Sequence, residues 1–342
     1  MRSNIQAYNT EKKDVTVCIP VFNGEKTISS ALESALKIHA LDVEILVSDN
    51  ASEDGTRNVV LKYQGKYPDR IRLILNERNT GFAGNYKKCL KEASGKYLFF
   101  IGADDSLNHE GLSVLINRLE NHPDEAIVTS DLNVFYINPD MPTRKLVHFS
   151  GKEKIFSAGD DALCNWLLNS ALGSIGGYLI RKSVVYESVD LIPDVTIVPQ
   201  LYLGAYIACR HGVSHVPVVS FAQRLSRDES QLANKQYLSA DIINEILFLI
   251  NSLSMLYKNE LKNDRHATEV LKTQYINGLI DNILPYRCFA PFGVFVKVIS
   301  IIVGNNRSAV INPKFMIYLA ASISLPKLII KKILFLYRSM QV

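Results

Sequence analysis

Two adjacent carboxylates, Asp104 and Asp105, stand in the segment GKYLFFIGADD, soon after the apolar run Tyr97–Ile101. A fully apolar run this short is typical of a strand buried on both faces, as in a parallel sheet. The carboxylates would then lie at the carboxyl end of the strand, where open α/β sheets bind their ligands. Two neighbouring acids there could hold a divalent cation, and the cation could hold a diphosphate. The alternative is a strand that ends in a solvated turn, because Asp is common in turns.

Polar side chains also follow the first two strands that the sequence predicts. Phe22 and Glu25 follow the first strand, and Asp49 and Asn50 follow the second. All of them would lie along one edge of the sheet, around the crevice where a nucleotide can bind. Phe22 could support a base, and Asp49 could accept hydrogen bonds from a base or a ribose. The sequence has no GxGxxG after the first strand and no GxxxxGK[ST], which argues against a dinucleotide cofactor and a P-loop NTPase.

The elements that must position these residues alternate in a regular order. Apolar, β-branched runs predict strands over 15–21, 43–47, 71–75 and 97–101, with helices between them. This alternation predicts an α/β fold with a doubly wound, mostly parallel sheet.

The rest of the chain is less regular. Two short strands are expected over 126–129 and 133–137, around Ser130-Asp131, and residues 138–160 are expected to be irregular. From about residue 241 the pattern is helical. We therefore expect three parts, which are an N-terminal tail (1–13), an α/β domain (14–235) and a C-terminal helical region (236–342).

The composition is that of a folded globular protein, with 47% hydrophobic and 21% charged residues in 342. The five cysteines are widely spaced and no pair has metal-ligand spacing, so we expect reduced thiols in a cytosolic protein. The polar N-terminus does not resemble a signal peptide. No stretch offers about 18 uninterrupted apolar residues, so a membrane span is not expected.

The charge is distributed unevenly along the chain. Residues 282–342 contain eight Lys and Arg residues and no Asp or Glu. The whole chain carries +4, so residues 1–281 carry −4. An apolar run over 315–325 and the final segment SLPKLIIKKILFLYRSM predict a basic amphipathic region on an anionic membrane surface. The alternative is a helical bundle that packs on the catalytic domain or forms an oligomer.

Several segments together resemble the family 2 glycosyltransferases, which are inverting enzymes with the A-type, Rossmann-like, nucleotide-sugar-binding fold. The matching segments occur in family order and are VTVCIPVFNGEKTISSALESAL, VEILVSDNASEDGT and NERNTGFAGNYKKCLKEASGKYLFFIGADD. They cover about residues 14–135, with a looser resemblance to about 230. The segments look most like those of bacterial enzymes that add sugars to surface polysaccharide or O-antigen.

The resemblance implies roles for individual residues. Pro20, Phe22 and Glu25 match the first nucleotide-contacting segment, and Asp49 matches the acid that contacts the base. Asp104 and Asp105 match the motif that binds Mn²⁺ or Mg²⁺ and the diphosphate.

The sequence departs from the family pattern at two places. Gly102 replaces the usual first acid of the metal motif, and Pro199-Gln200 stands where many members carry a Glu-Asp pair with the catalytic base. An inverting transfer needs a base to deprotonate the acceptor hydroxyl. The nearest carboxylates are Asp194, which we rank first, and then Asp228 and Glu229, although each could be a plain loop residue. Asp131 is the candidate if all three fail.

Two arginines follow the last predicted strand of the α/β domain. Arg224 and Arg227 could hold a substrate diphosphate, because a guanidinium suits phosphate, or could simply form a solvated basic loop.

The leading hypothesis is an enzyme that moves one sugar from a nucleotide-diphosphate sugar to a glycan or polyprenyl-diphosphate-linked acceptor. We expect it on the cytoplasmic face of a membrane, with no nucleic-acid partner and with self-association left open. The alternatives are a nucleotidyltransferase of similar fold, which would need a Gly-rich basic loop after the first strand, and a glycan-binding relative without turnover.

Overall fold

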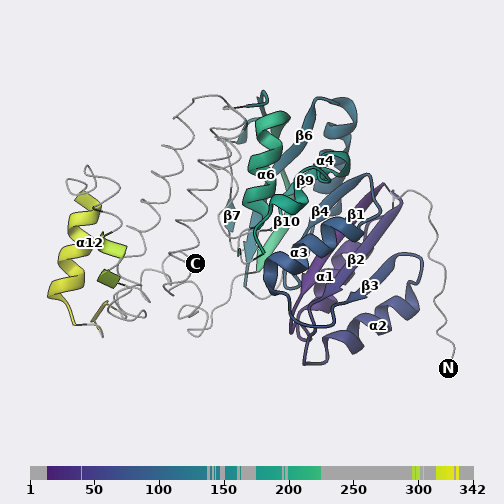
Figure 1. Ribbon diagram of the computed structural model, residues 1–342, viewed down its shortest axis with the longest axis horizontal. Coiled ribbons are helices and arrows are strands. Elements are labelled where there is room, and N and C mark those ends of the chain that lie inside the picture. Colours follow the sequence, from purple (N-terminus) through teal and green to yellow (C-terminus); the bar gives the residue numbers. More distant parts are fainter. Residues whose placement is uncertain are drawn as a thin grey trace. The chain divides into compact units, whose positions relative to one another are not determined.

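The computed structural model divides the chain into two compact units, Met1–Leu225 and Ser226–Val342. Figure 1 labels most of the described helices and strands. The described residues are 14–39, 41–136, 139–140, 142, 144–146, 151–159, 162, 175–194, 196, 199–224, 295–296, 298–300, 303, 313–326 and 329–330.

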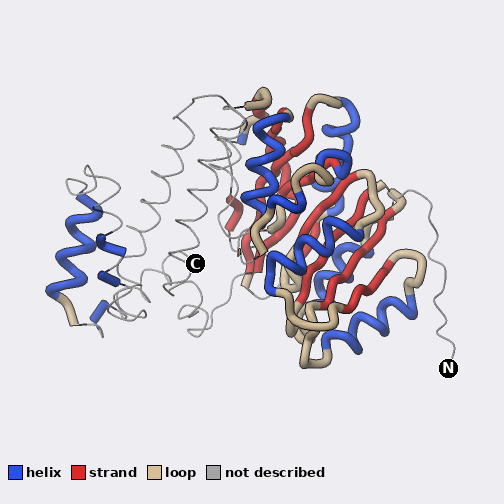
Figure 2. The backbone as a smooth tube through the Cα atoms, in the orientation of Figure 1, coloured by secondary structure: helices blue, strands red, loops and turns tan. Residues whose placement is uncertain are grey.

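The first unit is built on one mixed sheet, whose strands are red in Figure 2. The described strands run in the order β3-β2-β1-β4-β9-β6-β10-β5, with β7 on β6 and β8 on β10. The strands are β1 (Val15–Val21), β2 (Val43–Asp49), β3 (Ile71–Leu75), β4 (Tyr97–Phe100), β5 (Ser106–Leu107), β6 (Glu125–Phe135), β7 (Arg144–Leu146), β8 (Lys154–Phe156), β9 (Tyr178–Arg181) and β10 (Gly212–Arg224).

Strand direction brings the functional candidates to one edge of this sheet. β1 is parallel to β2 and β4, and β2 is parallel to β3. β9 is antiparallel to both β4 and β6, so β6 and its parallel neighbour β10 run in the same direction as β4. The carboxyl ends of β1, β2, β4, β6 and β10 therefore lie at the same edge.

Helices cover both faces of the sheet (Figure 1). Apolar residues of α1 and α4 share one core with alternate residues of β1, β2 and β4, and Val60 of α2 joins them. On the other face, Tyr86 of α3 stacks on Phe100 of β4, and α6 packs on β6. The described helices of this unit are α1 (Ile28–Leu36), α2 (Thr56–Lys66), α3 (Gly81–Glu92), α4 (His109–Asn121) and α6 (Pro199–Arg210).

The expected fold is confirmed for the first four strands and the mostly parallel sheet. Two local expectations are wrong. β6 is one continuous strand where two short strands were expected, because Ser130 and Asp131 have buried polar partners in the next strand and do not form a turn. Residues 138–160 contain β7 and β8, which pair with the edges of longer strands and have too few residues for a local signal.

In the second unit, the described residues include the helix α12 (Pro313–Ser324). None of the helices in the described ranges combines the length and the apolarity needed to cross a bilayer. The final segment that was expected to be amphipathic lies largely outside the described residues.

Candidate active site

The acidic pair lies at the carboxyl end of β4, as the sequence predicts. Asp105 is buried and Asp104 is exposed. One carboxylate oxygen of Asp105 accepts a hydrogen bond from the amide of Gly102 (3.1 Å), and the other accepts one from the amide of Arg224 (3.0 Å). The Arg224 side chain donates to the Asp104 carbonyl (3.0 Å) and lies over the ring of Phe135 (5.0 Å). Arg224, the last residue of β10, therefore belongs to the acidic site.

The surroundings of the pair disfavour negative charge. Burial raises the pKa of Asp105 to about 7, and the adjacent Asp104 carboxylate adds to this shift. Desolvation also raises the pKa of Asp104, while Arg224 acts in the opposite direction. A bound cation would relieve both shifts, since an opposite charge favours the ionised form of a carboxyl group.

The two carboxylates suit a hard cation that takes its remaining ligands from a phosphate. Among the described residues no group of three or more His, Cys, Asp or Glu could hold a metal ion. Mg²⁺ at nucleotide sites commonly takes only one or two carboxylates and completes its shell with substrate phosphates and water. The two adjacent carboxylates, both with a raised pKa and one of them exposed, therefore fit such an ion.

Gly102 leaves room for both acids. A Cβ atom at this position would lie 2.8 Å from Asp105 Oδ2 and 2.9 Å from Asp104 Oδ1. An acid here, as in the family that the sequence resembles, would force the two carboxylates to move. The carboxylates of Asp104 and Asp105 thus fill the space that the side chain of a first acid at position 102 would need.

The loops after β1 and β2 are joined by hydrogen bonds. The Glu25 carboxylate accepts from the amide of Gly55 (3.1 Å), and the Asp54 carboxylate accepts from the amide of Glu25 (3.1 Å). Asn23, which has a positive φ of 54°, accepts from the amide of Glu53 (2.9 Å). Through these contacts Glu25 and Asp54 hold the two loops together, and the expected contact of Glu25 with a nucleotide stays a prediction.

Next to these loops lie the residues that were expected to contact a nucleotide. Asp49 is buried at the end of β2 and accepts a hydrogen bond from the amide of Ser52 (3.0 Å). Phe22 is exposed at the end of β1, the neighbouring strand. Pro20 is buried within β1, opposite Ser48. The exposed ring of Phe22 and the carboxylate of Asp49 thus lie at the ends of neighbouring strands, where each could contact part of a nucleoside.

Two amide side chains fix this edge: Asn50, which the sequence places after the second strand, and Asn85, which it did not single out. The Asn50 side chain accepts from the amide of Thr80 (2.9 Å) and from Asn76 (3.0 Å), and it donates to the Gly81 carbonyl (3.1 Å). Asn85 of α3 accepts from Ser48 Oγ (2.7 Å) and donates to the Ser48 carbonyl (2.9 Å). Both Asn50 and Asn85 lie within the segments that carried the resemblance, which was the available signal.

Of the three carboxylates that were expected as the base, the described residues include only Asp194. Its side chain is 85% exposed and forms an ion pair with Lys87 of α3. This hydrogen-bonded pair lowers the pKa of Asp194. Asp228, Glu229 and the neighbouring Arg227 lie outside the described residues.

A further carboxylate, Asp131, lies near the edge that carries the acidic pair. Phe99 of β4 and Val128 of β6 both pair with Leu179 of β9, so Asp131 stands level with Gly102, two strands away. Two strand spacings correspond to roughly 10 Å. Asp131 is fully buried, 3.4 Å from His215 Nε2 and 3.3 Å from Lys145 Nζ.

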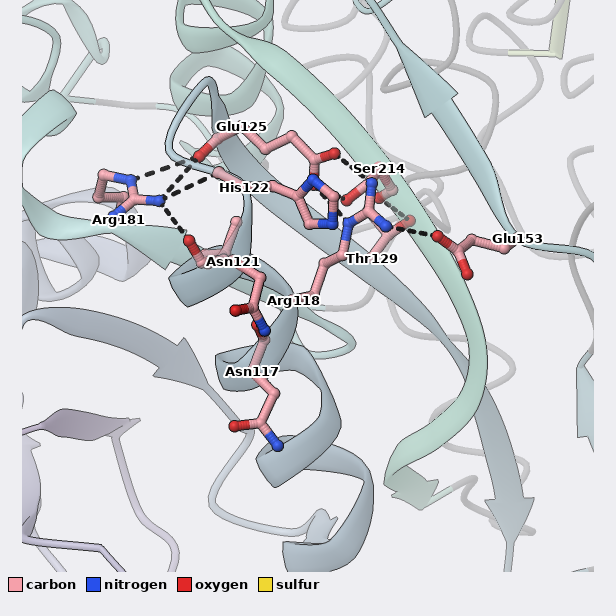
Figure 3. Close-up of polar contacts among 10 residues, drawn as sticks. Asn117, Arg118, Asn121, His122, Glu125, Thr129, Glu153, Arg181 and Ser214 are labelled. Atoms are coloured by element: carbon pink, nitrogen blue, oxygen red, sulfur yellow. Dashed lines mark hydrogen bonds and ion pairs between the residues drawn. The ribbon is translucent and has the colours of Figure 1, made fainter.

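Another polar cluster lies at the opposite end of β6 (Figure 3). The Glu125 carboxylate accepts from Arg118 Nε (2.8 Å) and from Ser214 Oγ (2.6 Å), and Arg118 also pairs with Glu153. Arg181 donates to the carbonyls of Leu119 (2.7 Å) and Glu125 (3.3 Å). Because these side chains satisfy one another at the amino end of β6, we interpret the cluster as structural.

Comparisons with known proteins agree with this architecture. Residues 16–185 match the family model described as glycosyl transferase family 2. The chain is 24% identical over 263 residues to a cholesterol galactosyltransferase of Borreliella burgdorferi, which covers 73% of this chain and 69% of the relative.

A second relative matches over a shorter stretch of sequence, and one solved structure is similar in fold. The chain is 40% identical over 91 residues to the UDP-Glc:alpha-D-GlcNAc-diphosphoundecaprenol beta-1,3-glucosyltransferase of Escherichia coli, and the match covers 27% of this chain and 35% of that relative. The match thus spans about a third of that relative's length. The crystal structure of S. aureus TarS 1-349 in complex with UDP-GlcNAc aligns with a TM-score of 0.60 at 19% identity, over 86% of this chain and 90% of that one. The last likeness concerns the fold.

Proposed function

This chain belongs to glycosyl transferase family 2 through its residues 16–185, and on this premise we propose that it transfers one sugar from a nucleoside-diphosphate sugar to a lipid-linked or glycan acceptor. The observation that carries the proposal is the arrangement at the carboxyl edge of the sheet. There Asp104, Asp105 and Arg224 lie at the ends of β4 and β10, while Asp49 and Phe22 lie at the ends of β2 and β1.

We assign the nucleoside end of the donor to the loops after β1 and β2. The Phe22 ring would support the base, and Asp49 would accept hydrogen bonds from the base or ribose. Asp104 and Asp105 would hold Mn²⁺ or Mg²⁺, which when bound would neutralise the diphosphate leaving group. Arg224, whose side chain reaches the backbone of Asp104, would add positive charge on the diphosphate side.

We propose an inverting reaction. An acceptor hydroxyl oxygen forms a bond to the anomeric carbon of the donor sugar, on the face opposite the diphosphate. The bond between that carbon and the diphosphate oxygen breaks, and its electron pair leaves with the nucleoside diphosphate. A carboxylate of the protein takes the hydroxyl proton.

Two described carboxylates compete for the role of base. Asp194 lies closest in sequence to the place of the family's acid pair, but its ion pair with Lys87 makes it a weaker base. Asp131 lies level with the acidic pair in the sheet and is itself paired with a lysine, Lys145. Asp228 and Glu229 remain candidates on sequence position alone.

The relatives suggest the kind of acceptor and the place of action. One of them is named for a diphosphoundecaprenol-linked acceptor and another for cholesterol, and both are lipids. We infer that this protein also meets a lipid-linked acceptor at the inner face of the cell membrane, in surface polysaccharide or O-antigen synthesis. The basic, acid-free C-terminal sequence supports this inference.

A donor panel tests the proposed function. Thermal shift with nucleoside-diphosphate sugars, with Mn²⁺ or Mg²⁺ and with excess chelator, should identify one donor that stabilises the protein in the presence of the ion. Asp104→Asn and Asp105→Asn should abolish transfer with the fold intact, whereas Glu110→Gln, an exposed acid on α4, should not. Full transfer in excess chelator would refute metal dependence, and the absence of any stabilising donor would refute the proposal itself.

One observation favours a second candidate function. Gln200 is buried at the start of α6, where many family members carry the catalytic acid. A relative that binds glycans without turnover would retain donor or glycan binding and show neither hydrolysis nor transfer in the same panel.

A further inference from the structure

The helix α12 of the second unit turns apolar side chains outward. Met316, Ile317 and Ile323 are exposed, with 65% of Ile317 and 73% of Ile323 accessible, and Ala320 between them is exposed too. Their spacing places them on one side of the helix, while Phe315 and Ser322 are buried on the other side. A surface helix ordinarily turns polar residues to water, so this outward face needs a partner.

The charge of the surrounding sequence indicates what that partner is. Residues 282–342 contain eight Lys and Arg residues and no acid, and Lys314 is exposed in the first turn of α12. A protein surface would usually offer charges of both signs to such a region. Only an anionic surface complements one sign of charge beside an apolar helix face.

We propose that the outward face of α12, formed by Met316, Ile317, Ala320 and Ile323, docks on an anionic lipid bilayer. The apolar side chains would enter the boundary between headgroups and acyl chains, and Lys314 in the first turn of the helix would lie near lipid phosphates. A helix of 12 residues is about 18 Å long, short of the hydrocarbon core of about 30 Å, so α12 would lie along the surface. The inference deepens the proposed function, on which it rests for its purpose, because it names the surface where a lipid-linked acceptor would be met.

The test is sedimentation of the full chain with vesicles, which requires no turnover. The wild-type chain should pellet with equimolar phosphatidylglycerol and phosphatidylcholine vesicles at low salt, and much less with phosphatidylcholine alone. Ile317→Asn/Ile323→Asn should lower the partition into anionic vesicles by about ten-fold or more without changing the charge. Ile155→Asn/Leu191→Asn, which removes two comparably exposed apolar side chains from the first unit, should leave binding unchanged.

A gain-of-signal variant covers the case in which the double variant misfolds. Ala320→Trp places a reporter on the proposed face in a chain with one tryptophan, and its emission should shift to the blue with anionic vesicles. The proposal is overturned if the wild-type chain does not pellet, if the Asn double variant binds as well as wild type, or if the Ala320→Trp emission does not shift.

Two measurements separate lipid docking from self-association through α12 and from the proposed function. If sedimentation equilibrium shows a wild-type dimer that Ile317→Asn/Ile323→Asn converts to monomer, α12 is a contact between copies and the lipid proposal fails. Transfer to a water-soluble acceptor should be the same in the double variant and wild type. Vesicle binding without transfer by the wild-type chain would sink the proposed function and leave the docking inference standing.

Discussion

Asp105 accepts two backbone hydrogen bonds at the end of a buried strand, and a second carboxylate follows the same strand. The pKa of Asp105, about 7, means that its carboxyl group keeps its proton in the folded protein up to neutral pH. A carboxyl group binds a cation only after it has lost this proton, so proton and cation compete. The acidic pair therefore makes the affinity for a metal–diphosphate complex depend on pH.

We predict that affinity for Mn²⁺ with a nucleoside diphosphate rises by up to about ten-fold per pH unit below pH 7 and levels off above it. Calorimetric titrations between about pH 5.5 and pH 8 measure this dependence. Without the cation, the raised pKa has the opposite effect on folding. Stability is greatest below the unfolded-state pKa near 4 and falls as pH rises through 7. Affinity that stays constant over this range would contradict the assignment of Asp105 to the metal.

The Asp49 carboxylate is expected to accept hydrogen bonds from the donor. Asp49→Ala should raise the donor KM by about ten-fold or more, because a hydrogen bond to a charged group contributes about 1.5–3 kcal/mol. Steady-state kinetics measures the change. Glu53→Ala, an exposed acid in the same loop, is the matched control and should leave KM unchanged. Equal KM values in both variants would reduce Asp49 to a turn residue that binds the Ser52 amide.

The identity of the base can be decided between Asp131 and Asp194. Removing a general base should lower kcat by about 10²–10⁴-fold without changing the donor KM. If the base is the carboxylate that lies level with the acidic pair in the sheet, Asp131→Asn should show this loss. If it is the carboxylate closest in sequence to the place of the family's acid pair, Asp194→Asn should show it. A pH profile of kcat should lose its acidic limb in the variant that lacks the base. Wild-type kcat in both variants would move the role to Asp228 or Glu229.

At the scale of elements, α4 and β6 are held together at one end by a buried ion pair. Arg118 and Glu125 are only 10% and 6% exposed, and Ser214 of β10 adds a hydrogen bond to the Glu125 carboxylate (Figure 3). Glu44 forms a comparable buried pair with Arg72 between β2 and β3. A buried carboxylate that loses its cation is left with an uncompensated charge.

Arg118→Met should therefore lower the free energy of unfolding by about 3–5 kcal/mol. The matched control is Lys96→Met, which breaks the exposed pair of Lys96 with Glu120 of the same helix and should cost less than about 1 kcal/mol. Urea denaturation followed by circular dichroism measures both losses. Similar losses in the two variants would show that burial does not set the strength of these pairs.

At the scale of the whole molecule, charge separates the C-terminal sequence from the rest of the chain. Residues 282–342 carry +8 and residues 1–281 carry −4. Raising the salt concentration from about 0.1 M to about 1 M shortens the screening length from about 10 Å to about 3 Å. Binding to anionic vesicles should weaken steeply over this range, as measured by sedimentation. Binding that salt does not change would mean that apolar contact alone holds the protein on the lipid.

Local sequence was enough to predict the alternating strands and helices and the acids at the strand ends. Both follow from local chemistry, because an apolar run of four to seven residues between polar turns has few alternatives to a buried strand. The ranges of the first four strands along the chain, and the positions of Asp49, Asp104 and Asp105 at their ends, were therefore predictable.

The folded structure was needed to see how distant segments complete the site. β9 enters between β4 and β6 in the antiparallel direction, which sets Asp131 level with Gly102. Arg224 reaches the acidic pair across 120 residues of sequence. The raised pKa of Asp105 depends on burial by several elements at once. Neither the pairing of distant strands nor the desolvation of a carboxylate is encoded in any local pattern, since both arise only when the strands assemble into the sheet.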